Sequence, residues 1–231
     1  AEIVRRRAGR LLSRTDVKIL MDGVRATDPQ VMEDLVTIGV TTGEVQRVLA
    51  GLLDDGVPIR DLVRILEAIG DRARTNRSIE SMVEAARGEL GPAITGALAK
   101  DNRLTVITLS AGTEHRLVSS LRISEGTSQL ELAPDAADQL VRTLTEWVGA
   151  TANGGVTPVL VCSAPLRASL GRLVKAMVPG MAVIAYSEIG DHLEIDLVAN
   201  IDITGGDVRH ADVNGTTDPN NQERFDAYAA T

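Results

Sequence analysis

Two apolar stripes of helical period, which follow one another between Gly43 and Asp71, constrain the fold of this chain most. In each stripe the apolar residues recur at the spacing that places them on one face of a helix. Gly56 and Pro58, between the stripes, are typical of the end of one helix and the first turn of the next. We therefore predict two short amphipathic helices that pack antiparallel on a tight turn. The stripes consist of Val45, Val48, Leu49, Leu52 and Leu53, and of Ile59, Leu62, Val63, Leu66 and Ile69.

The polar positions of the same segment lie opposite the stripes, on the outside of the expected helices. They mix acidic and basic side chains but form no catalytic set. We interpret the segment as one that packs through its apolar face and contacts a partner through its polar face. The predicted partner-binding residues are Glu44, Arg47, Arg60, Asp61 and Arg64.

The rest of the chain divides near residue 100. Residues 1–98 have helical patterns throughout, beginning with an expected helix at residues 3–12. Residues 99–204 alternate β-branched apolar runs with helical stretches, which is typical of a mostly parallel sheet with helices on its faces. We predict an α+β fold: an all-helical subdomain, then a small α/β subdomain, then a disordered acidic tail at residues 205–231.

The strands of the α/β part are expected from runs of β-branched and apolar residues. The last strand follows its predecessor after only a loop, so we expect it to run antiparallel to a neighbour at an edge of the sheet. A short helix at residues 113–121 and a short strand at residues 130–132 are also expected. The four main strands are expected at residues 104–109, 158–162, 181–186 and 193–203.

Composition excludes several kinds of partner and site. Aromatic residues make up only 2% of the 231 residues and the formal net charge is −8, so neither base stacking nor binding to a phosphate backbone is favoured. The single cysteine, Cys162, lies in an apolar run and is expected to be buried; one cysteine forms neither an internal disulfide nor a cysteine-based zinc site. No apolar run approaches the ~20 residues that span a bilayer. We expect a soluble protein of a reducing compartment.

Two features could carry chemistry, and each has a simpler interpretation. Gly91 and Gly96 have the spacing of a phosphate-binding loop, but Ala97 and Leu98 stand where that loop needs a lysine and a serine or threonine. A helix break is the expected structure there. Ser163 lies between a strand and a helix, where a hydrolase nucleophile could lie, but it lacks the flanking glycines of that motif. A helix cap is the expected role.

Scattered histidines and carboxylates give no metal-ligand spacing, and no calcium loop is present. We therefore predict no catalytic residue, no cofactor and no metal site, and we expect these side chains to be solvated. They are His115, His192 and His210, and the carboxylates Glu188, Asp191, Glu194 and Asp196.

Five arginines lie within the first fourteen residues. Such a cluster could meet anionic lipid or nucleic acid. We favour a different interpretation, the outer face of a helix from a longer protein, because the chain begins within a helical pattern and without an initiator methionine. The five are Arg5, Arg6, Arg7, Arg10 and Arg14.

Several motifs of the chain resemble the cytoplasmic region of the FlhA family, the export-gate membrane protein of flagellar and related type III secretion systems. The match in the central helical segment is the most specific, and the strand motifs are weaker. The motifs in the helical half are RRRAGRLLSR (5–14), DVKILMD (16–22), GEVQRVL (43–49), LLDDGVPIRDL (52–62) and ILEA (65–68). Those in the second half are VITL (106–109), PVLV (158–161), LRASL (166–170) and VIAYSEI (183–189).

The resemblance implies the third and fourth subdomains of that cytoplasmic region, in a protein held at the cytoplasmic face of the bacterial inner membrane by a membrane region that this chain lacks. It implies self-association into a nine-membered ring below the export channel, through the helical subdomain. It also implies docking of export substrates, chaperones and other export-apparatus proteins, with the flagellar branch more similar than the injectisome branch. The main chaperone cleft lies in preceding subdomains, so no chaperone-binding residue is carried over.

Two other functions stay open at this point. A cytosolic α/β enzyme, such as a small hydrolase, would need polar side chains at the carboxyl ends of the strands. Only a few are expected there: Ser110, Ser163, Ser187 and Glu188. A free-standing adaptor without a membrane anchor would share the contact surface but lack membrane spans upstream. We favour a non-enzymatic part of an export gate.

Overall fold

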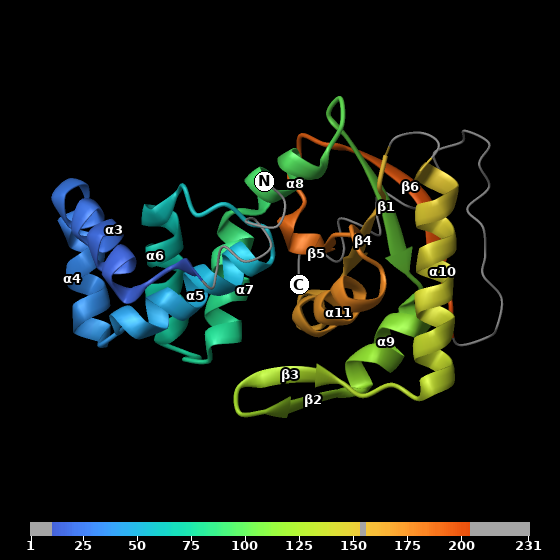
Figure 1. The fold of residues 1–231 in the computed structure, drawn as a ribbon, viewed down its shortest axis with the longest axis horizontal. Helices are drawn as coiled ribbons and strands as arrows, with labels where there is room; N and C mark the ends of the chain where they lie inside the picture. Colours follow the sequence, from blue (N-terminus) through green and yellow to red (C-terminus); the bar gives the residue numbers. More distant parts are fainter. Residues whose placement is uncertain (1–10, 153–155, 204–231) are drawn as a thin grey trace. The chain divides into compact units, whose positions relative to one another are not determined.

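The computed structural model describes residues 11–152 and 156–203, which form two compact units (Figure 1). One unit comprises the described residues up to Ile94 together with Glu125–Thr127, and the other comprises Thr95–Ser124 and the described residues from Ser128 onward. We call them the helical unit and the α/β unit. The predicted α+β fold is confirmed. The expected helix at residues 3–12 and the expected tail lie largely or wholly outside the described residues.

The helical unit is built from helices whose ends carry capping signals. Ser13 and Asp16 form a reciprocal capping box at the start of α3, and Pro29 opens α4. Gly39 ends α4 with φ 77°, the left-handed conformation that glycine adopts without strain. The helices are α3 (Arg14–Thr27), α4 (Pro29–Ile38), α5 (Thr42–Asp54), α6 (Leu62–Ala73) and α7 (Ile79–Glu89), and α8 (Gly91–Leu98) crosses the boundary between the units.

The helices α5 and α6 correspond to the two apolar stripes, and the stripe residues Val45, Val48, Leu49, Leu52, Leu62, Leu66 and Ile69 are buried. Their predicted antiparallel packing on each other is wrong. Both helices pack mainly against α7, and α5 also packs against α3 while α6 packs against α4. The reason is the connection: α6 begins only at Leu62, capped by Asp61, so Pro58 lies in an extended linker rather than in the first turn of a helix.

The α/β unit contains a four-stranded sheet in the order β5-β4-β1-β6, and every neighbouring pair is parallel. The predicted antiparallel direction of the last strand is therefore wrong. The strand β5 is only three residues long, so the connection that follows it, through the 3-10 helix η1, is long enough to return to the end of the sheet where β1 begins. There β6 starts beside β1 and runs parallel to it. The strands are β1 (Arg103–Leu109), β4 (Val159–Cys162), β5 (Val183–Ala185) and β6 (Glu194–Ile201), and η1 is Tyr186–Glu188.

Three helices accompany this sheet: α9 (Ala111–Ser119), α10 (Pro134–Ala152) and α11 (Ala164–Met177). Their apolar faces and the sheet share one core, in which Cys162 is fully buried as predicted. A separate two-stranded ribbon, β2 (Leu121–Ser124) and β3 (Thr127–Leu130), replaces the strand expected at residues 130–132. Its turn residues Glu125 and Gly126 both have positive φ, at 52° and 75°, which suits a tight hairpin.

Candidate partner-binding surface of the helical unit

The start of α5 is held by a set of charged and hydroxyl groups around Glu44. The Glu44 carboxylate accepts hydrogen bonds from the Thr41 N–H at 2.8 Å and from the Thr41 hydroxyl at 2.7 Å, while the Thr41 hydroxyl accepts one from the Glu44 N–H at 3.2 Å. Arg77 donates to the same carboxylate at 2.9 Å and also to the carbonyl of Gly39. Arg77 therefore ties the loop before α7 to the end of α4 and the start of α5.

This environment favours the charged form of Glu44. The hydrogen bond from Arg77 is the main cause, and the bonds from Thr41 add to it, so that together they outweigh the opposing effect of burial and lower the pKa of Glu44 to about 2. The Glu44 side chain is only 13% exposed. Glu44 is thus engaged inside the helical unit, and its predicted contact with a partner stays a prediction.

Basic side chains with no carboxylate partner in the described chain gather where α3 meets α5. Arg47 is exposed and its Nε donates to the carbonyl of Gly43 at 3.3 Å. The guanidinium of Arg14 lies against the same residue, since a Cβ at Gly43 would be 3.4 Å from it. Lys18 lies one turn further along α3 and is exposed. We call Arg14, Lys18 and Arg47 the basic patch.

The remaining predicted residues lie at the start of α6. Asp61 caps this helix, accepting from the Arg64 N–H at 3.4 Å, and it also pairs with the Arg64 guanidinium at 3.4 Å. Both side chains are about half exposed. Arg60 is exposed just before them. The structure therefore places the five predicted residues in two groups, with Glu44 and Arg47 on α5 and the others at the beginning of α6.

A groove of about 670 Å³ runs along α4 and α6. Gly70 lies where the two helices meet, and a Cβ there would be in ordinary van der Waals contact with Leu35 at 3.5 Å and Ile38 at 3.6 Å. Apolar side chains, including Leu35, Ile38 and Leu66, contribute to its lining. We call this feature the α4–α6 groove.

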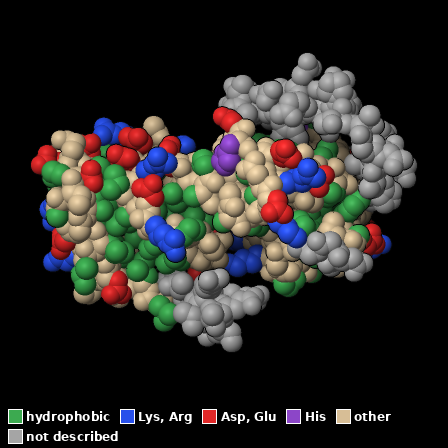
Figure 2. All heavy atoms as spheres, turned by 90° about the horizontal axis from the view of Figure 1, so that it is seen from above, with side chains coloured by type: hydrophobic (Ala, Val, Ile, Leu, Met, Phe, Trp, Pro, Cys, Tyr) green, Lys and Arg blue, Asp and Glu red, His purple; other side chains and the backbone are tan. Residues whose placement is uncertain are grey.

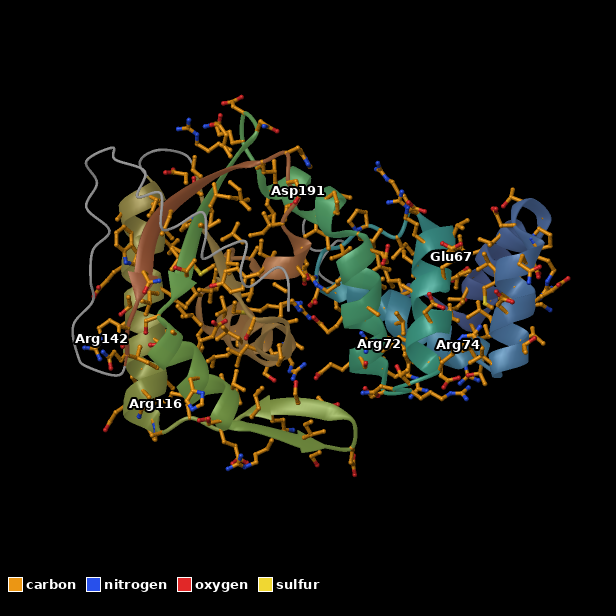
Figure 3. All side chains as sticks on the ribbon, turned by 180° about the vertical axis from the view of Figure 1, so that it is seen from behind. Glu67, Arg72, Arg74, Arg116, Arg142 and Asp191 are labelled. Atoms are coloured by element: carbon orange, nitrogen blue, oxygen red, sulfur yellow. The ribbon has the colours of Figure 1, made fainter. Side chains whose placement is uncertain are left out.

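The polar lining of the α4–α6 groove is strongly acidic. Six carboxylates and two guanidinium groups line it, an excess of four negative charges. No ion pair neutralises any of the six carboxylates within the described part of the chain, and Arg64 is already paired with Asp61. Figure 3 labels Glu67 within α6 and Arg74 just beyond its end. The charged lining residues are Asp28, Glu33, Asp34, Glu67, Asp71 and Glu89, with Arg64 and Arg74.

Apolar side chains are also exposed on the helical unit, which lies on the left of Figure 2. Leu11, Ile19 and Val36 are each about two-thirds exposed, at 68%, 65% and 67%. Single exposed apolar side chains are ordinary on protein surfaces, so these three do not by themselves mark a binding site.

Sequence reasoning found Arg64 but missed the groove, because its lining comes from helices that only the fold brings together. The helix-capping roles of Glu44 and Asp61 could have been predicted from the sequence. Thr41 followed three residues later by Glu44 is the capping-box pattern, and Asp61 precedes an apolar stripe as a helix cap would.

In the α/β unit, Ser163 holds the N-cap position of α11 without making the expected side-chain capping bond. The carboxylate of Glu114, a buried residue of α9, accepts from the Ser163 N–H instead. The buried Ser163 hydroxyl finds no hydrogen-bond partner among the described residues. This arrangement positions α11 against α9.

The other sequence candidates are dispersed. His115 and His192 are exposed as expected, and His210 lies outside the described residues. The expected solvation of Glu188 is wrong, because this side chain is buried at the end of the 3-10 helix η1. Gly91 and Gly96 both lie within α8, so they form no phosphate-binding loop. Over residues 11–152 and 156–203 no group of three or more His, Cys, Asp or Glu side chains is placed to hold a metal ion. None of the described helices is long and apolar enough to cross a membrane.

The model of the FHIPEP family matches residues 1–194. The chain belongs to the FHIPEP family. Curated relatives are similar to this chain at moderate identity. Flagellar biosynthesis protein FlhA of Bacillus subtilis is 29% identical over 203 residues, and that of Escherichia coli is 30% identical over 200 residues. These matches cover 87% and 86% of this chain but only 30% and 28% of the relatives. This FHIPEP chain therefore spans less than a third of their length.

Solved structures share the fold of this FHIPEP chain. The cryo-EM structure of nonameric EPEC SctV-C matches with a TM-score of 0.77 at 20% identity, covering 87% of this chain and 60% of the SctV-C chain. The structure of the Chlamydia pneumoniae CdsV and CdsO protein complex matches with a TM-score of 0.78 at 20% identity, covering 87% of this chain and 59% of the matched chain.

Proposed function

We propose that this chain is the ring-forming cytoplasmic part of a flagellar type III protein export gate, which docks export substrates and chaperones below the export channel. The match of residues 1–194 to the FHIPEP family carries the proposal. The moderate identity to FlhA proteins favours the flagellar branch. In this proposal residues 1–98 and 99–204 act as subdomains, and a region outside this chain holds the protein at the inner membrane.

Self-association into a nonameric ring and contact with other export-apparatus proteins belong to the proposal. Support comes from proteins of the same fold: SctV-C is described as nonameric, and CdsV is described in complex with CdsO.

The proposed ring contacts use Glu44, Arg47, Arg60, Asp61 and Arg64. Of these, Arg47 and Arg60 offer exposed guanidinium groups without a carboxylate partner in the described structure, whereas Glu44 and Asp61 first serve their own helices. A ring needs heterologous contacts, in which two different surfaces of the same chain meet. Exposed charge pairs set register more than affinity, so we expect the isolated chain to be mostly monomeric.

Charge reversal in the full-length protein that carries this sequence tests the proposal. Arg60→Glu and Arg64→Glu should reduce ring assembly, measured by cross-linking in membranes, and should reduce flagellar protein export, measured from secreted filament protein. Arg142→Glu on α10, an exposed arginine of the α/β unit, is the matched control. Unchanged assembly and export in both the Arg60→Glu and the Arg64→Glu variant would count against the proposed contacts. Normal export without the whole gene product would refute the export function.

A further inference from the structure

The helical unit carries two surfaces of opposite charge on different helix pairs. The basic patch lies on α3 and α5, and the α4–α6 groove is acidic. In this bundle α5 packs against α3 and α7, whereas α4 packs against α3 and α6, so the two surfaces belong to different edges of the unit. A chain with two unlike, complementary surfaces can join head to tail with copies of itself.

Among the residues that the structure describes, no ion pair neutralises the cations of the basic patch or the carboxylates of the groove. Near the basic patch, the carboxylate of Asp16 is bound by Ser13 and that of Glu44 is bound by Arg77. No carboxylate of the described residues is ion-paired with the three cations, so a second copy can supply the opposite charge. The α4–α6 groove has the complementary charge, an excess of four negative charges among its lining residues.

We propose that the α4–α6 groove of one copy binds the basic patch of a second copy. This inference rests on the proposed ring and adds to it the surfaces that meet and their polarity. Lys18 and Arg47 are long side chains that can reach carboxylates such as Glu67 and Asp71 while their alkyl stems cover apolar side chains of the groove. The charges then fix which edge of one subunit faces which edge of the next.

A charge-swap experiment in the full-length protein tests the contact. The pair Lys18→Glu and Arg47→Glu, and separately the pair Glu67→Lys and Asp71→Lys, should each lower the fraction of assembled rings about tenfold; the protein carrying all four changes should recover most of it. All four residues are exposed, so thermal unfolding of the variants should match that of the parent. Equal loss in the four-residue variant would overturn the proposal, because a merely structural effect cannot be reversed by the partner change.

Disulfide cross-linking locates the contact independently. Cys162 is the only cysteine of these 231 residues and is buried, so in this chain a Cys162→Ser parent leaves the engineered cysteines as the reactive ones. Mixing a Lys18→Cys protein with a Glu67→Cys protein should give a cross-linked dimer on mild oxidation. Mixing Glu146→Cys, on an exposed site of α10, with Glu67→Cys should not.

The cross-linking result and the assembly state together distinguish the head-to-tail contact from ring formation itself. Cross-linking of the first mixture above the control supports the head-to-tail contact. Rings that form without that cross-link overturn the contact but leave the ring. A full-length protein that never assembles, by sedimentation in detergent, overturns both.

Discussion

Replacing Glu44 with glutamine should destabilise the helical unit in a way that depends on pH. The ordinary pKa of 4.5 falls to about 2 for Glu44 in the folded chain, which corresponds to at most about 3 kcal/mol of stabilisation. Its partner Arg77 is 45% exposed. Screening by water therefore reduces the free energy of unfolding that Glu44→Gln is expected to lose at pH 7 to about 1–2 kcal/mol. The lowered pKa means that this contribution is complete above pH 4.5 and fades as the pH falls towards 2.

Urea unfolding followed by circular dichroism at 222 nm measures this difference for Glu44→Gln between pH 7 and pH 3. Fluorescence of Trp147, the only tryptophan, reports on the α/β unit and should change little. The control is Asp22→Asn, which removes an ion pair of 3.1 Å whose side chains are 57% and 50% exposed; it should cost about 0.3 kcal/mol. A Glu44→Gln effect no larger than the control, or one that stays constant down to pH 3, would refute this account.

Four further substitutions differ in the sign or size of their effect on stability, and the same urea unfolding measures them. Gly51→Ala should destabilise by about 1 kcal/mol, because its Cβ would lie 2.9 Å from a Val83 methyl group. Gly70→Ala should stabilise by about 0.5–1 kcal/mol, because alanine favours a helix more than glycine does and its Cβ would make only ordinary contacts. Arg87→Ala should cost about 2–3 kcal/mol, because the side chain is 3% exposed and ion-paired at 3.4 Å. Ser163→Ala should stabilise by about 1 kcal/mol and leave export unchanged, because it removes a buried hydroxyl that has no hydrogen-bond partner among the described residues.

Local sequence signals predicted most elements of the fold. The run at 104–109 became β1 and the run at 158–162 became β4, because β-branched residues suit buried parallel strands. The direction of β6 could not be predicted, since it depends on how far the connection after β5 travels. The hairpin at residues 121–130 was also missed: its strands are short and mostly exposed, and only the turn at Glu125 and Gly126 marks it.

The candidate site was less predictable than the fold. Helical spacing shows that Glu44 and Arg64 point away from an apolar stripe, but it does not show which charges are paired within the unit. Glu44 meets Arg77, which is 33 residues away along the chain, and only the packing of α7 brings them together. The α4–α6 groove has the same origin, because helices distant in sequence supply its lining.

The charged side chains of the helical unit therefore fall into two groups: those that are ion-paired within the described unit, and those that are not. Glu44 is paired with Arg77, so Glu44→Gln should lower stability more than it lowers ring assembly at temperatures where the unit stays folded. Lys18 and Arg47 have no carboxylate partner in the described structure, so reversing them should impair assembly while the urea midpoint stays unchanged. Measuring both quantities on both variants separates the charges that fold this unit from those left for a second copy. If the two variants lost stability and assembly in equal proportion, this division would not hold.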